Sequence, residues 1–121
     1  MPDERLFSLA SAGKLSDPKV LEKEFNRMLA DPKSDRFVSD FLASWLNLGA
    51  LGTTPPDLNA FKEYYIDDLA AAMKKETFLF TRHILDEGLP IDRFINSDFT
   101  FVNSGLARLY QFDVTIDGSE Y

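Results

Sequence analysis

Apolar residues at helical spacing mark two main stretches of the chain. In the first, residues 37–48, hydrophobic side chains recur every three or four positions. They are Phe37, Val38, Phe41, Leu42, Trp45 and Leu48. Such spacing places side chains on one face of an α-helix. Asp31 can cap this helix and Pro32 suits its first position. The pattern therefore predicts an amphipathic helix rich in aromatic residues, which we call the Phe/Trp helix.

The second stretch predicts the longest helix of the chain, over residues 61–87. One stripe of this helix consists of Ile66, Leu69, Ala70, Met73, Thr77, Phe80 and Ile84. Gly88 and Pro90 follow it closely and are typical of a helix end. We expect this long helix to be central in the fold and to pack against the Phe/Trp helix.

Shorter patterns complete an all-α fold. Helices are also predicted at residues 3–12, 18–29 and 104–110, with a helical turn at 91–95. The stripe of the helix at 18–29 consists of Leu21, Phe25, Met28 and Leu29. Residues 49–59 contain Gly, Thr and Pro at positions that favour an ordered loop. The sequence therefore predicts a single domain, one compact bundle of about five helices over residues 1–110, with a tail at 111–121.

Composition narrows the classes of function. The chain has 121 residues, enough for one domain, and 45% of them are hydrophobic, enough for a core. The net charge of -7 would repel phosphate backbones, so nucleic acid is excluded as an expected partner. No apolar run approaches the roughly 18 residues of a membrane span. Because the chain has no cysteine, it has no disulfide, thiolate metal site, cysteine nucleophile or c-type haem attachment of its own.

Glu76 is the first candidate for chemistry. Glu76 lies three residues after Met73 and four residues before Phe80, both on the apolar stripe. Helical spacing therefore places its carboxylate on the apolar face. A charge there needs a partner or a shifted pKa. One interpretation is a general acid or base, or a ligand. The favoured interpretation is a buried ion pair with Arg27 or Arg36, or bonding assisted by Thr77, because structural ion pairs also perturb pKa values.

Other catalytic or metal patterns are weak. His83 lies seven residues after Glu76 and four before Glu87, but the Glu-x-x-His spacing of di-iron bundles is absent because Phe80 occupies the required position. We therefore expect no metal site and a solvated or helix-end histidine. The sequence also lacks a Gly-x-Ser-x-Gly elbow and a Gly-rich phosphate loop.

Aromatic and proline residues suggest an interaction surface. The aromatic stripe of the Phe/Trp helix is more typical of a core than of a ligand groove. An exposed apolar surface is expected at the loop residues Pro55 and Pro56 with Tyr64 and Tyr65, and at the alternating tail residues Phe112, Val114 and Ile116. Such patches would have faced neighbouring domains.

An ordered series of motifs resembles a known family. It begins with residues 27–32 (Arg-Met-Leu-Ala-Asp-Pro) and the Phe/Trp helix, and continues with residues 73–77 and 98–103, then Leu106-Ala107 and Tyr110. This series resembles a domain of unknown function found in very large planctomycete proteins, often in the same chain as a cytochrome-c-like haem domain. The resemblance covers residues 6–110. The family pattern has glycine after the last helix, whereas this chain has Gln111, so we expect that helix to end differently.

The resemblance implies a context for the chain. The parent protein would extend beyond both ends, its haem would be bound outside this cysteine-free segment, and its location would be exported or periplasmic. We therefore expect a non-catalytic structural or interaction module whose partners are neighbouring domains of the same polypeptide. The alternative is a fragment of an enzyme that acts in carbohydrate or redox chemistry with those neighbours. That alternative requires a solvent-reachable cleft with Glu76 and a second titratable group.

Overall fold

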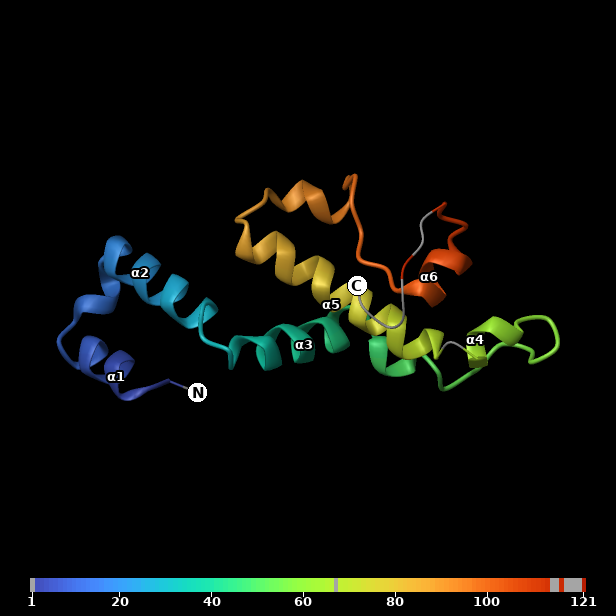
Figure 1. The fold of residues 1–121 in the computed structure, drawn as a ribbon. Helices are drawn as coiled ribbons and strands as arrows, with labels where there is room; N and C mark the ends of the chain where they lie inside the picture. Colours follow the sequence, from blue (N-terminus) through green and yellow to red (C-terminus); the bar gives the residue numbers. More distant parts are fainter. Residues whose placement is uncertain (1, 67, 114–115, 117–120) are drawn as a thin grey trace. The chain divides into compact units, whose positions relative to one another are not determined.

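All regular secondary structure in the described part of the chain is helical. The structure is a computed structural model that describes residues 2–66, 68–113, 116 and 121 (Figure 1). The all-α prediction is confirmed within these ranges. The single compact bundle is not confirmed, because the chain divides into two compact units, residues 1–35 and residues 36–121.

The first unit contains two helices joined by a short 3₁₀ turn. They are α1 (Glu4–Ser11), η1 (Lys14–Ser16) and α2 (Pro18–Leu29). Each α-helix starts at an aspartate whose carboxylate accepts a backbone N–H: Asp3 from Leu6, and Asp17 from Lys19, both at 2.9 Å. These caps satisfy donors that would otherwise have no partner in the first turn. The predicted helix starts are therefore explained by local chemistry.

The second unit contains the remaining elements. They are most of α3 (Ser34–Trp45), then η2 (Leu48–Ala50), α4 (Lys62–Ile66), α5 (Leu69–Asp86), η3 (Ile91–Phe94) and α6 (Ser104–Leu109). The helix predicted over residues 61–87 is divided into α4 and α5. Asp68, just before α5, has a left-handed backbone with φ of 46°. A residue in this conformation cannot continue a right-handed helix, and aspartate tolerates it better than most residues.

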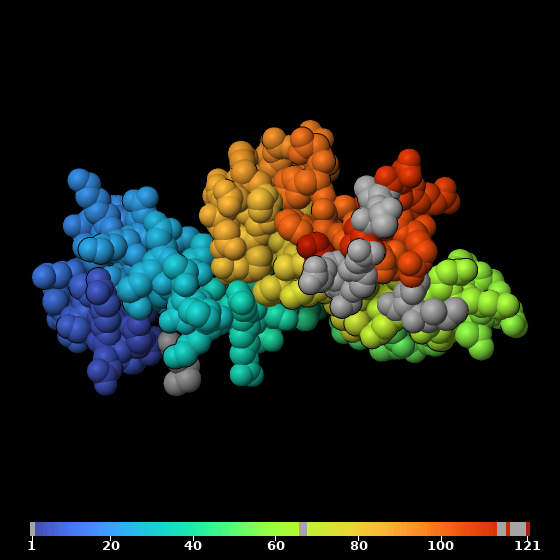
Figure 2. Space-filling view, viewed as in Figure 1, coloured from blue at the N-terminus to red at the C-terminus, as the bar shows by residue number. Residues whose placement is uncertain are grey.

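The core of the second unit lies where α5 meets α6. Leu69, Ala72 and Leu106 form a buried cluster, and Tyr64, Met73 and Val102 pack against it. Figures 1 and 2 show α6 against the N-terminal half of α5. Asn103 begins α6, and its side-chain oxygen accepts the N–H of Leu106 at 3.0 Å. This cap orients α6 so that Leu106 enters the core.

The end of α6 corrects a prediction. Gln111 adopts a left-handed φ of 58°. Its N–H donates to the carbonyl of Arg108, and the N–H of Phe112 donates to the carbonyl of Ala107. These two bonds form a Schellman motif, which usually has glycine at the left-handed position. The helix therefore ends in the geometry that glycine favours, although the residue is glutamine, and the expectation of a different ending was wrong.

Gln111→Gly is consequently expected to stabilise the domain by about 1 kcal/mol, because a side chain with a Cβ is strained in the left-handed region. Urea denaturation measures the gain. Gln111→Ala is the control, since alanine keeps the Cβ and should give no comparable gain. Equal gains from both variants would contradict the strain argument.

Candidate functional site

Glu76 joins three segments of the second unit. It lies half-buried near the middle of α5. One carboxylate oxygen accepts the hydroxyl of Thr100 at 2.6 Å, and the other accepts the hydroxyl of Tyr110 at 2.7 Å. Thr100 belongs to the segment before α6, and Tyr110 directly follows that helix. Each carboxylate oxygen thus has a hydroxyl donor from a segment distant in sequence, an arrangement that fixes α6 relative to α5.

The Glu76 carboxylate also changes the titration of nearby tyrosines. Burial is the largest cause that raises the pKa of Tyr110 to about 12, and the hydrogen bond to Glu76 adds to it. Burial likewise raises the pKa of Tyr121, with a further contribution from the negative charges of Glu76 and Asp68. The hydroxyl of Tyr121 lies 3.3 Å from the carbonyl oxygen of Ala72. Both phenols therefore stay protonated near neutral pH and act as donors.

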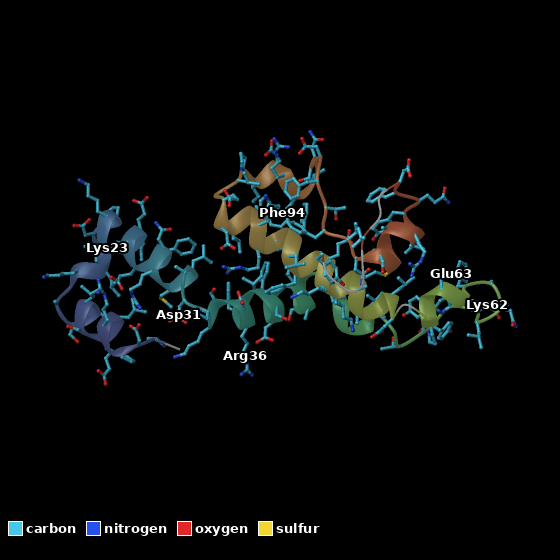
Figure 3. All side chains as sticks on the ribbon, in the orientation of Figure 1. Lys23, Asp31, Arg36, Lys62, Glu63 and Phe94 are labelled. Carbon is cyan, nitrogen blue, oxygen red and sulfur yellow. The ribbon has the colours of Figure 1, made fainter. Side chains whose placement is uncertain are left out.

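The structure gives Glu76 hydroxyl partners where the sequence suggested an arginine. Arg36 points away from α3 (Figure 3), and its Nε lies 3.8 Å from a carboxylate oxygen of Asp40. Thr77 donates its hydroxyl to the carbonyl of Met73. Arg27 belongs to the first unit, where its partners are acidic residues of that unit.

A carboxylate that sequence analysis did not select is the most buried charged group described. Glu24 of α2 is 2% exposed. Arg5 lies 2.7 Å from one of its oxygens, and Nε of Arg27 lies 2.7 Å from the other. The Nη2 atom of Arg27 lies 2.9 Å from the Oδ2 atom of Asp3, the residue that caps α1. This network, Asp3, Arg5, Glu24 and Arg27, joins α1 to α2 by charge.

The network has a consequence in acid. The hydrogen bond from Arg5 is the largest cause that holds the pKa of Glu24 below its usual range, and a backbone hydrogen bond from Leu6 does most to lower the pKa of Asp3. A carboxyl group whose pKa is lower in the folded state contributes stability above its unfolded pKa and loses it as pH falls through the folded value. We therefore expect the first unit to lose helix below about pH 4.

This expectation can be followed residue by residue. NMR titration of the side-chain carboxyl carbons should show Glu24 protonating at lower pH than a free glutamate. In the Glu24→Gln variant, the amide signals of α1 and α2 should disappear at a lower temperature or a lower urea concentration than in the native chain. Glu22→Gln, an exposed neighbour on the same helix, is the matched control. Equal effects of the two variants would contradict the structural role of the network.

The only histidine packs among aromatic rings. His83 is half-buried in the last turn of α5, with its ring centroid 4.9 Å from that of Phe99 and 5.6 Å from that of Phe101. In the described part of the chain, no three His, Asp or Glu side chains gather as a set of metal ligands. The predicted helix-end position of His83 is therefore confirmed, but its ring packs against aromatic rings instead of solvent, because residues 99–101 pass beside the end of α5.

The aromatic residues of the Phe/Trp helix form an exposed ridge. We define the aromatic ridge as Phe37, Phe41 and Trp45 of α3. These side chains are 67%, 49% and 56% exposed, respectively. Successive ring centroids are 6.2 and 5.5 Å apart, and Trp45 contacts Phe94 of η3 edge-on at 5.9 Å. The core of α3 is formed instead by Val38 and Leu42, which are 2% and 1% exposed.

The residues expected at an interface are placed differently from one another. Pro55 is exposed, as are Tyr65 (42%) and Phe112 (46%). Tyr64, by contrast, packs against the core, and Pro56 is half-buried with its carbonyl accepting the hydroxyl of Tyr65. Ile116 is half-buried, and Val114 lies outside the described residues.

Fold and contacts together define an all-α domain with a structural carboxylate in each unit and an exposed aromatic ridge. The family model described as PSD4, protein of unknown function (DUF1592), matches residues 1–112. The chain belongs to this family, and the resemblance to a domain of unknown function is thereby confirmed. Comparisons with curated proteins and with solved structures gave no match. Within the described ranges, none of the helices combines the length and hydrophobicity needed to cross a bilayer.

Proposed function

We propose that this domain is a non-catalytic interaction module that packs against neighbouring domains of a larger polypeptide. The aromatic ridge carries the proposal. Three large rings in contact with one another are about half or more exposed along one helix. Contiguous apolar surface of this kind marks interaction sites, and aromatic side chains are enriched at the centres of interfaces.

The state of Glu76 supports a non-catalytic role. A general base needs an oxygen that can reach a substrate proton. Both oxygens of Glu76 already accept short hydrogen bonds from Thr100 and Tyr110. This use of the carboxylate favours a structural role over the alternative of an enzyme fragment in carbohydrate or redox chemistry.

The finer context rests on the family resemblance. The parent would be a large, exported or periplasmic planctomycete protein that carries a cytochrome-c-like haem domain. The haem would be bound outside this chain, because c-type attachment needs cysteines that the chain lacks. The reading frame of the complete gene tests this context directly: a Cys-x-x-Cys-His motif in the same frame supports it, and its absence counts against it.

Hydroxyl-radical footprinting tests the interaction role. In the isolated chain, we expect strong oxidation of Phe37, Phe41 and Trp45. In a longer polypeptide that includes the neighbouring domains, we expect these three residues to be protected. Phe99, which is half-buried inside the unit, serves as the internal reference. Equal oxidation of the ridge in both proteins would refute the proposal.

A variant strengthens this test. Phe41→Glu places a charge on the ridge without disturbing the core, so the isolated domain should keep its helical circular dichroism. In the longer polypeptide, the same change should restore oxidation at Phe37 and Trp45. Leu21→Glu is the matched control, because Leu21 is 55% exposed and belongs to α2 of the first unit. It should leave the footprint unchanged.

A further inference from the structure

A small apolar pocket is lined by residues of α3, η2 and α5. Its volume is about 170 Å³. The apolar part of its lining comes from Leu42 of α3, Leu48 of η2 and Phe78 of α5. An engineered, fully apolar cavity of about 150 Å³ admits benzene. The pocket is therefore of the right size for one six-membered ring.

The polar lining of the pocket is suited to an anion. Two polar side chains contribute, Ser39 of α3 and Lys74 of α5. No ion pair or hydrogen bond engages the side chain of Lys74 in the described part of the chain. A lysine ammonium offers three donors and no acceptor, and a serine hydroxyl can donate as well. Lys75 adds a second positive charge nearby, since its ammonium lies 5.3 Å from the ring centre of Phe78.

We propose that this pocket binds small aromatic carboxylates of the size of benzoate. The ring would lie among Leu42, Leu48 and Phe78, and the carboxylate would face Lys74 and Ser39. An apolar pocket with a few polar groups that fix orientation is the usual form of a small-molecule site. The proposal does not depend on the aromatic ridge, because none of the ridge residues lines the pocket.

NMR titration of the complete 121-residue chain with benzoate tests the proposal. We expect amide shifts concentrated at the residues that line the pocket, with a Kd on the order of 1 mM for so small a ligand. Benzyl alcohol has the same ring without the charge and should bind about three- to tenfold more weakly. Shifts that are absent or scattered over both units would overturn the site. Equal affinity for the two compounds would overturn the assignment of a carboxylate ligand.

Two variants test the contribution of the Lys74 charge. Lys74→Met should weaken benzoate binding about three- to tenfold and leave benzyl alcohol unaffected. Lys23→Met removes an equal charge from an exposed position on α2 (Figure 3) and should change neither affinity. Unchanged benzoate binding by Lys74→Met refutes the proposal.

Discussion

Leu106→Ala is expected to destabilise the second unit by about 2–5 kcal/mol, the range for a fully buried leucine. Leu106 is 0% exposed and forms the buried cluster together with Leu69 and Ala72. The loss has two parts, the apolar surface that is no longer buried and the cavity left among neighbours that cannot fully close. Helix α6 has six residues, too few to be stable by itself, so its position depends on this contact.

The fluorescence of Trp45 during urea denaturation measures this effect. Trp45 is the only tryptophan of the chain and lies in the second unit, so its signal reports that unit alone. Leu109→Ala removes the same atoms from the same helix at a position that is 42% exposed. It should change the free energy of unfolding by no more than about 0.5 kcal/mol if its effect is that of a surface site. Comparable losses in the two variants would contradict the assignment of the core.

The sequence predicted helix content well because the relevant signals are local. Capping by Asp17, the Gly88 stop and the Asn103 cap each act within a few residues, and periodicity identifies the side chains that share a face. The break before α5 was missed because Asp68 adopts a left-handed backbone without the glycine or proline that usually indicates one. The residues around Asp68 in the sequence therefore give no signal of that conformation.

Periodicity did not reveal which faces meet other elements. Leu21 and Phe25 belong to the apolar stripe predicted for residues 18–29, yet these side chains are 55% and 60% exposed, while Glu24 between them is buried. The aromatic stripe of α3 is likewise exposed. A spacing of three or four shows that side chains share a helix face, but burial depends on a partner for that face. An apolar stripe therefore predicts a contact and leaves its location open.

The candidate site was predicted in position but not in partners. Its place on the apolar stripe identified Glu76 as a carboxylate that needs bonding, and it has two hydrogen bonds. The donors, Thr100 and Tyr110, are 24 and 34 residues away along the sequence. The sequence suggested arginine because a carboxylate attracts a positively charged side chain, and such residues can be found in the sequence. Which hydroxyl lies close enough to donate to Glu76 depends on the fold. Glu24 was missed for a similar reason: Arg27 is three residues away on the same helix, but Arg5 reaches Glu24 only when α1 packs on α2.

Glu76→Ala is expected to destabilise the second unit by about 1.5–3 kcal/mol, the range for hydrogen bonds to a charged group. Tyr110 and Thr100 would lose their acceptor, but water can partly replace it because the site is half-exposed. A buried ion pair would have predicted a larger loss of about 3–5 kcal/mol. Glu63→Ala, at an exposed carboxylate of α4 (Figure 3), is the matched control and should have little effect. Trp45 fluorescence in urea measures both variants.

The pH dependence of the same contact distinguishes a structural role from a general loss of packing. The pKa of Tyr110 is raised from the ordinary tyrosine value of 10.0 to about 12 in the folded state. A group with a raised folded pKa contributes stability that is complete below its unfolded pKa and is lost as pH rises through the folded value. Stability should therefore fall between about pH 10 and 12 in the native chain. Tyr110→Phe should lose less over this interval, because it has no phenol at that position to ionise.

The ultraviolet absorbance of tyrosinate follows the ionisation of the Tyr110 phenol directly. In Glu76→Ala, the pKa of Tyr110 should fall below 12 because the hydrogen bond and the negative charge are gone. It should stay above 10, because burial is the largest cause of its shift and remains. The absorbance titration is run on the Glu76→Ala variant and on the double variant that also carries Tyr110→Phe. The difference between the two curves is the titration of Tyr110 alone, without the other three tyrosines. An unchanged Tyr110 titration in Glu76→Ala would mean that the carboxylate does not hold this hydroxyl in solution, and the role of Glu76 in fixing α6 to α5 would be lost with it.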